Sequence, residues 1–176
     1  LDSGIFEKRR NLTIATLLQF YTPNEGETSQ EYIAQGLGEF QDEIWRTYDI
    51  MAELNILPNT LLTKMSGGEL RRASLARDLV GDPDLLLMDE PTNHLDIPTI
   101  LWLENKLNKF RGSLVIISHD REFLKNTINT CLWLHMNQSF KLTKGFEYFE
   151  EWSEKIQADI KQERHKRDQF LKAEGR

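Results

Sequence analysis

Two short apolar segments constrain the fold of this chain more than any other feature. Leu85–Met88 and Leu114–Ile117 are apolar at every position, the pattern typical of strands buried on both faces. Between them, Asp96 precedes a segment with Pro98 in its first turn and apolar residues at helical spacing, which predicts a capped helix. Strand, helix and strand in that order predict parallel strands joined by a right-handed crossover, and therefore an α/β fold.

Polar residues follow both predicted strands. Asp89 and Glu90 come directly after the first, and His119 follows the second after one serine. Since ligands of open α/β sheets bind at the carboxyl ends of the strands, we expect these residues to lie together. Asp89 is a suitable oxygen ligand for phosphate-bound Mg²⁺, Glu90 is suited to activating an attacking water, and His119 to bonding a terminal phosphate. The alternative is that they are ordinary turn residues.

A second candidate site is the segment Ser66-Gly67-Gly68-Glu69. Ser and Glu at this spacing form a capping box, so a helix is expected to begin here and to end at Gly81. The glycines let a ligand approach the backbone, while free amides and the helix dipole favour phosphate. The alternative is an ordinary capped helix after a glycine-rich turn.

The remaining segments give a coarser outline. Apolar residues at spacings of three and four predict a helix from about Glu39 to Asn55, which Pro58 ends. Its expected buried face consists of Phe40, Ile44, Tyr48, Met51 and Leu54. We also expect a short strand at Ile14 to Leu18 ending in Gln19, a hairpin over 131–143 and a long helix from Glu147 onward.

Together these motifs resemble the ATP-binding cassette (ABC) proteins. Met65–Arg72 is similar to their signature motif, Leu85–Glu90 to the Walker B strand, Leu95-Asp96 to the D-loop, Ser118–Asp120 to the H-loop and Gln19 to the Q-loop. The sequence of Pro91–Asp96 is characteristic of the ABC-F subfamily, whose members carry two cassettes in one chain and no membrane domain. The region after Asp120, including Lys144–Phe149, resembles the end of the first cassette of a Uup-type member, and the basic segment after it resembles the start of the linker between cassettes.

The resemblance implies how the chain is divided. Residues 1–146 are expected to be an incomplete ABC-type nucleotide-binding domain with parallel core strands and a helical signature subdomain, and 147–176 the start of a linker helix between cassettes. No G-x-x-x-x-G-K-[ST] phosphate loop occurs in the sequence. In the family this Walker A loop precedes the Q-loop, so we expect the chain to be a fragment that cannot hydrolyse ATP by itself.

The resemblance also implies a set of site residues. ATP and Mg²⁺ are the expected cofactors, and a second cassette of the same chain is the expected partner. Two ATP molecules would lie between two cassettes. The implied catalytic residues are Glu90 and His119; the implied nucleotide contacts are Gln19, Ser66, Gly67, Gly68, Glu69 and Asp96; and the implied Mg²⁺ ligands are Asp89 and Gln19.

Charge and composition limit the possible binding partners and the cellular location of the chain. Residues 22–60 hold eight acids and one base, which disfavours nucleic-acid binding there, whereas Lys161–Lys172 holds five bases and two acids. This basic segment suits ribosomal RNA or DNA, or else a solvated linker. No apolar run is long enough to span a bilayer, so a cytoplasmic ATPase is expected. The alternatives are a membrane transporter's ATPase subunit and a degenerate scaffold without catalysis.

Overall fold

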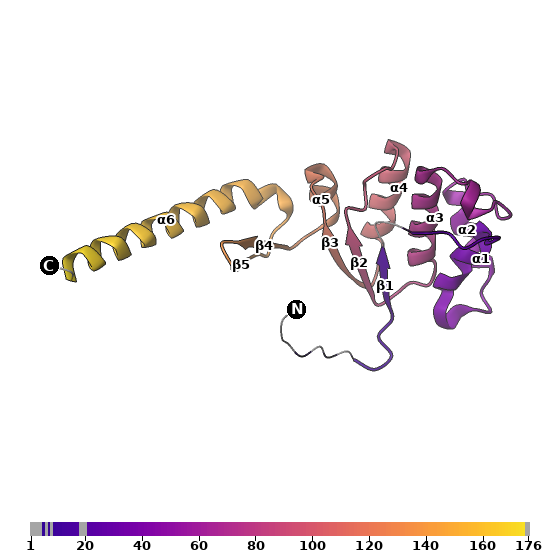
Figure 1. Cartoon of the computed structure of the whole chain (residues 1–176), viewed down its shortest axis with the longest axis horizontal. Helices are drawn as coiled ribbons and strands as arrows, with labels where there is room; N and C mark the ends of the chain where they lie inside the picture. The colour runs from indigo at the N-terminus through magenta and orange to yellow at the C-terminus, as the bar shows by residue number, and fades with distance from the viewer. Residues whose placement is uncertain (1–4, 6, 8, 18–20, 175–176) are drawn as a thin grey trace. The chain divides into compact units, whose positions relative to one another are not determined.

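Figure 1 shows the chain as a computed structural model, which describes residues 5, 7, 9–17 and 21–174. The chain separates into two compact units, and the division falls between Asp120 and Arg121. This division lies earlier than the predicted end of the cassette at residue 146. Contacts within a chain do not define where a cassette ends, so the boundary at residue 146 stays a prediction.

The first unit contains a sheet of three parallel strands in the order β1-β2-β3. These are β1 (Ile14–Leu17), β2 (Leu85–Asp89) and β3 (Ser113–Ile117). The helix α4 (Ile97–Asn108) connects β2 to β3, and Asp89 is paired with Ile117 at the carboxyl ends. The parallel strands and the helical crossover between them, predicted from two apolar runs, are confirmed.

The prediction that both apolar strands are buried on both faces is wrong for β3. In β2, Leu86 and Met88 are buried and the alternate side chains are half-buried. In β3, however, Val115 is 51% exposed and Ile117 is 63% exposed. An uninterrupted apolar run shows that both faces can accept a covering layer, but β3 is the edge strand and, within the described part of the chain, this face of it stays largely exposed.

Helices of the first unit pack beside the sheet. The α-helices α1 (Ser29–Ala34), α2 (Trp45–Glu53) and α3 (Gly67–Val80) contact one another, and the 3₁₀ segments η1 (Gln35–Phe40) and η2 (Leu62–Lys64) connect them (Figure 1). Their shared core includes Tyr32, Leu37, Met51 and Leu75, each at most 2% exposed. This group forms the predicted helical subdomain.

The predicted helix from Glu39 to Asn55 is wrong in its start and in part of its buried face. The chain forms η1 up to Phe40, turns, and begins α2 only at Trp45. Met51 and Leu54 are buried as predicted, but Phe40, Ile44 and Tyr48 are at least 39% exposed. Residues 41–44 form a turn between η1 and α2, so the helical spacing counted from Phe40 does not continue into α2.

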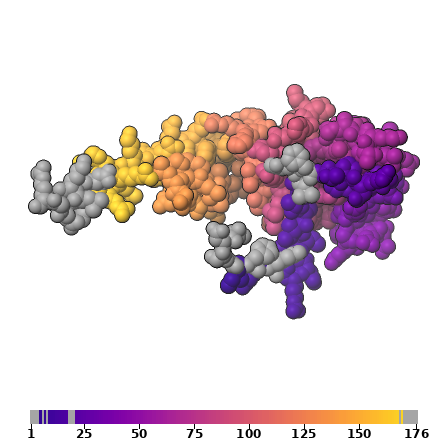
Figure 2. Space-filling model, in the orientation of Figure 1, coloured from indigo at the N-terminus to yellow at the C-terminus, as the bar shows by residue number. Residues whose placement is uncertain are grey.

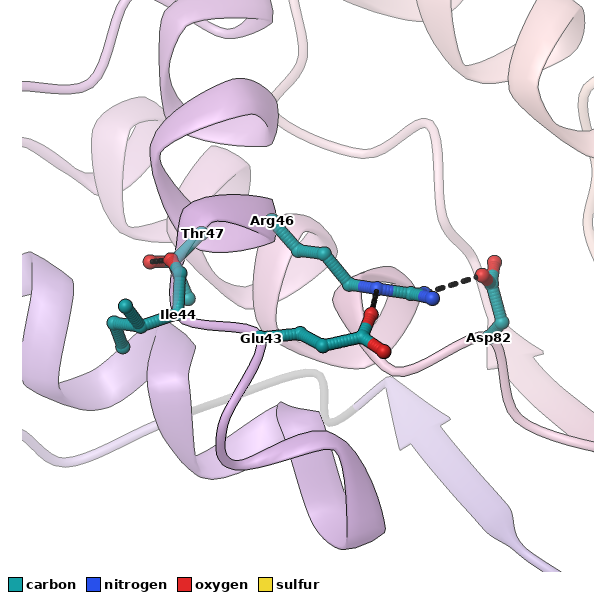
Figure 3. Close-up of polar contacts among 5 residues, drawn as sticks. All are labelled: Glu43, Ile44, Arg46, Thr47 and Asp82. Carbon is teal, nitrogen blue, oxygen red and sulfur yellow. Dashed lines mark hydrogen bonds and ion pairs between the residues drawn. The ribbon is translucent and has the colours of Figure 1, made fainter.

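Arg46, the one base of the acidic segment 22–60, joins α2 to the turn after α3 (Figure 3). Its guanidinium donates to Glu43 and, at 2.8 Å, to Asp82. The same group lies 4.6 Å from the centre of the Phe40 ring. The Arg46 guanidinium therefore links α2 to the turn after α3 and stabilises this part of the subdomain.

Two glycines allow η1 to approach the end of α3 closely. A Cβ atom on Gly36 would lie 1.7 Å from the carbonyl oxygen of Arg77, and one on Gly81 would lie 2.2 Å from that of Gly36. Neither position can accept a larger residue unless the backbone shifts. Gly81 also follows the last residue of α3, so the predicted end of that helix is confirmed.

The second unit is built from a hairpin and two helices. It contains α5 (Arg121–Thr127), the antiparallel strands β4 (Cys131–His135) and β5 (Gln138–Leu142), the 3₁₀ turn η3 (Phe146–Tyr148) and α6 (Phe149–Glu174). The predicted hairpin and long helix are confirmed. Trp133 packs against Phe149 and Trp152, with ring centres 5.9 and 6.0 Å apart.

Farther along α6 the helix loses these contacts. Residues 161–167 are all exposed, and the yellow end of the helix extends past the hairpin in Figures 1 and 2. None of the helices in the described residues has the length and apolar character needed to cross a membrane.

Candidate functional site

Glu90 follows β2 in an unusual backbone conformation. Its φ is 46°, in the left-handed region that non-glycine residues rarely adopt. Such a conformation costs on the order of 1–3 kcal/mol and occurs most often at functional sites. Its amide donates to the carbonyl of Ile117 at 2.8 Å, which ties the turn to the end of β3.

The Glu90 carboxylate lies against the turn after β3. One oxygen accepts from the His119 amide at 3.3 Å and from the Ser118 hydroxyl at 3.5 Å, and the other lies 3.5 Å from His119 Nε2. The Glu90 side chain is only 15% exposed, whereas that of His119 is 98% exposed. The sequence prediction that these two residues lie together is confirmed, and the arrangement offers a held carboxylate beside an accessible imidazole.

Asp89 is the last residue of β2 and is half-buried. Among the described residues, no group of three or more His, Cys, Asp or Glu side chains is placed to hold a metal. Gln19, the other predicted Mg²⁺ ligand, lies outside the described residues. One carboxylate fits a Mg²⁺ that takes most of its ligands from phosphate and water, and does not fit an all-protein metal cage.

Ser66 caps α3 by the predicted capping box. Its hydroxyl accepts from the Glu69 amide at 3.3 Å, and its own amide donates to the Glu69 carboxylate at 2.8 Å. The hydrogen bond from the Ser66 hydroxyl is the main reason that the pKa of Glu69 lies below its usual value. The Glu69 carboxylate is thus committed to the cap, and its predicted contact with nucleotide stays a prediction.

Gly67 and Gly68 are not required by the fold. A Cβ atom on Gly67 would meet nothing within 4 Å, and one on Gly68 would meet only the carbonyl of His94 at an ordinary 3.5 Å. No hydrogen bond among the described residues uses the amides of these two glycines. The first turn of α3 therefore combines amides that bond no group of the described residues with glycines that have room around them, which is suited to an anion.

Asp96 caps α4 and borders a cavity. Its carboxylate accepts from the Thr99 amide at 3.1 Å, and this bonding lowers its pKa. With Arg72, Thr99 and Trp102 it lines a cavity of about 180 Å³ among α2, α3 and α4. The cap was predicted, whereas the predicted nucleotide contact of Asp96 stays a prediction.

Arg71 is a residue of this site that sequence reasoning missed. It is 7% exposed, and its Nη2 donates to the carbonyls of Glu90 at 2.8 Å and Asp89 at 3.4 Å. Burial lowers the pKa of its guanidinium. The sequence signal was a basic residue one turn into a helix, between Leu70 and Arg72, which does not indicate where the side chain ends.

Comparison with known protein families and relatives gives matches over most of the chain. A family model described as ABC transporter matches residues 5–93, slightly more than half of the chain. The ATP-binding protein Uup of Buchnera aphidicola (from Acyrthosiphon pisum) is 39% identical over 156 residues, and that of Caulobacter vibrioides is 40% identical over 150. Each alignment covers 85% of this chain but only 26% and 24% of the relative, so the chain spans about a quarter of their length.

Solved structures share the fold at lower identity. A post-hydrolysis dimer of an ATP-binding cassette bound to ADP and Pi matches with a TM-score of 0.60 at 22% identity, covering 76% of this chain and 64% of that chain. The structure of RNase-L Inhibitor matches with a TM-score of 0.63 at 22% identity, covering 81% and 29%. These similarities establish the α/β nucleotide-binding fold.

Proposed function

This chain belongs to the ABC transporter family, and from that membership we propose that it is part of a tandem-cassette ABC-F ATPase of the cytoplasm. Its two strand-end residues Glu90 and His119 serve one ATP, and the N-terminus of α3 serves another. The chain then supplies parts to two nucleotide sites and completes neither alone.

The proposal is carried by the Glu90 carboxylate, which is held at the sheet edge by the His119 amide and the Ser118 hydroxyl. Glu90 accepts a proton from the attacking water, and His119 donates a hydrogen bond to the terminal phosphate as charge develops. Asp89, together with Gln19, would hold a Mg²⁺, which would supply positive charge against the phosphates. This preserved pairing disfavours a degenerate scaffold.

At the other site, Ser66, Gly67 and Gly68 bind the terminal phosphate of an ATP held by the second cassette. The open amides of the two glycines support this assignment, because bare backbone at a helix N-terminus can approach a phosphate closely. Asp96 and Glu69 keep the helices that flank this surface capped, and we place both beside the nucleotide.

The 176 residues alone are not expected to hydrolyse ATP, because they contain no Walker A lysine and no phosphate-binding loop. ATP hydrolysis by the purified chain, abolished by Glu90→Gln, would contradict this. A chain with the loop added upstream and a second cassette supplied is the positive control.

The proposed target is ribosomal RNA or another nucleic acid, reached through α6. Its exposed segment from Lys161 carries the basic residues that contact phosphates. The alternative, an ATPase subunit of a membrane transporter, is disfavoured by Asn93-His94, where transporter cassettes more often carry Ser-Ala.

The central test is Glu90→Gln in the full-length protein. We expect ATP turnover to be lost while ATP binding remains, because the amide cannot accept the proton but keeps the size of the side chain. Glu27→Gln is the matched control: Glu27 also accepts several hydrogen bonds, from Tyr21 and Asn24, but lies outside the site. Normal hydrolysis by Glu90→Gln would refute the assignment.

A further inference from the structure

The turn that carries Glu90 is held at three points, and the proposed reaction uses only one of them. The amide of Glu90 donates to Ile117, and its carboxylate accepts from His119. The third point is its carbonyl oxygen, which accepts from the Asn93 amide at 3.3 Å and from Arg71 of α3 at 2.8 Å. We propose that Arg71 is a positioning residue for hydrolysis, which aims the Glu90 carboxylate by holding the backbone of its turn.

The need for such a contact follows from the backbone of Glu90. Its φ of 46° turns the chain sharply out of the strand, so its carbonyl leaves the ladder of the sheet. A carbonyl in this position needs donors outside the sheet. The Asn93 amide of the same turn is one, at 3.3 Å, and Arg71 is a second that reaches the turn from α3; its Nη2 also lies 3.4 Å from the carbonyl of Asp89. One guanidinium therefore contacts both peptides that precede Pro91.

The chemistry of Arg71 favours a positioning role over simple packing. A guanidinium is costly to bury, and this one is 7% exposed. Removing one buried charge while its acidic neighbours remain is usually destabilising, so Arg71 also contributes to the stability of the fold. An apolar side chain could fill space here but could not donate to both carbonyls from the neighbouring helix, as the planar guanidinium does.

Losing the Arg71 contact should lower the rate of ATP hydrolysis and leave the affinity for ATP unchanged. Arg71 bonds the carbonyl oxygens of Asp89 and Glu90, so its effect on the Glu90 carboxylate passes through the backbone. A catalytic group displaced by about 1 Å can lose roughly 100-fold in rate. This inference rests on the proposed function, since it requires that Glu90 is the base.

The test measures kcat and KM of the full-length protein carrying Arg71→Met, with Arg71→Gln as a second neutral variant in case the first does not fold. We expect kcat to fall roughly 100-fold while KM for ATP changes less than about twofold, because binding does not use the Glu90 carboxylate. Arg71→Lys keeps the charge and an ammonium donor but loses the planar fork of the guanidinium, so it is expected to recover part of the rate.

Arg46→Met is the matched control. Arg46 also bridges two elements, from α2 to Asp82, but far along the chain from the Glu90 turn and without any role in the proposed reaction (Figure 3). It should lower thermal stability and leave kcat unchanged. If Arg46→Met and Arg71→Met lower kcat equally, the loss reflects general destabilisation and the positioning role is refuted.

Combination with Glu90→Gln separates the two proposals. If Arg71 acts through Glu90, adding Arg71→Met to Glu90→Gln lowers the residual single-turnover rate no further. If Glu90→Gln alone hydrolyses ATP normally, the proposed function fails. If Glu90→Gln is inactive but a folded Arg71→Met or Arg71→Gln keeps the wild-type kcat, only the positioning role fails. A rise in KM at unchanged kcat refutes it as well.

Discussion

Two helices of the first unit begin with the same capping box, but only one of them lies at the candidate site. At α1, the Thr28 amide donates to Glu31 at 2.9 Å and the Glu31 amide returns a bond at 3.4 Å. At α3, the corresponding bonds between Ser66 and Glu69 measure 2.8 and 3.3 Å. The cap chemistry is thus the same at both helices.

The two helices differ in the amides that follow the cap. In α1, the amides of Ser29 and Gln30 donate to the carbonyls of Thr60 and Pro58 at 2.9 and 3.1 Å, so the neighbouring chain covers them. In α3, Gly67 and Gly68 stand at the equivalent positions, and no hydrogen bond within the described parts of the chain uses their amides.

The difference between α1 and α3 shows that a capping box and uncovered amides carry separate information. A capping box determines where a helix starts, and its presence gives no information about a ligand. Uncovered amides, with glycines that the fold does not require, indicate that something else approaches the helix end. On this criterion α3 is a candidate anion site and α1 is not.

The largest effect is expected from Gly68→Ala in the full-length protein. The fold tolerates the methyl group, whose nearest neighbour is the His94 carbonyl at 3.5 Å, so the loss would come from a blocked phosphate. Losing one such backbone donor costs roughly 100-fold in rate, which we expect in an ATPase assay. Gln30→Ala, at the equivalent position of α1, is the control and should leave turnover unchanged.

A folded Gly68→Ala protein that hydrolyses ATP at the wild-type rate would contradict the proposed difference between the N-termini of α1 and α3. The glycines would then have no ligand to accommodate, and α3 would be a capped helix like α1. Circular dichroism and thermal unfolding of the 176-residue chain establish the folded state independently, since alanine is the better helix former and should not lower stability.

A smaller effect distinguishes the role of Ser66 in capping α3 from its proposed role in binding ATP. Ser66→Ala and Thr28→Ala each remove one capping oxygen, so each should lower the free energy of unfolding by about 1 kcal/mol in urea titrations of the chain. Only Ser66→Ala should also lower ATP turnover of the full-length protein. If Thr28→Ala lowers turnover to the same extent, then stability, and not the position of Ser66, explains both losses.

Much of this could be predicted from the sequence because the signals were local or periodic. The apolar runs before Asp89 and before Ser118 were sufficient for the parallel strands, and Ser66 with Glu69 for the start of α3. The box of Thr28 was equally visible in the sequence and was overlooked, because no glycine or family motif drew attention to it.

Other features depend on contacts that no local pattern carries. The start of α2 depends on the turn at residues 41–44, and the exposure of Val115 on what covers the edge strand. The contact of Arg71 with the Glu90 turn joins positions far apart in the sequence, and a long flexible side chain has many possible partners. The strand order placed Glu90 beside His119 but did not reveal this third support.

The smallest expected effect is a change in how the free energy of unfolding depends on pH below 4.5. The pKa values of Glu31 and Glu69 both lie below the ordinary 4.5, chiefly because of hydrogen bonds from Thr28 and Ser66. A depressed pKa in the folded state means that the unfolded chain binds the proton more tightly, so the contribution to stability is present above pH 4.5 and is lost as the pH falls through the folded values. Gln at either position removes the titration but keeps an oxygen for the cap.

Glu31→Gln and Glu69→Gln should therefore each flatten the fall in stability of the chain below pH 4.5, and by similar amounts, because the two boxes have similar bonds. Urea unfolding at several pH values measures this, with inorganic phosphate left out of the buffer. A clearly larger change at Glu69 would mean that the open end of α3 also alters the carboxylate before any ligand binds. Equal changes would leave the uncovered amides of Gly67 and Gly68 as the feature that distinguishes α3 from α1.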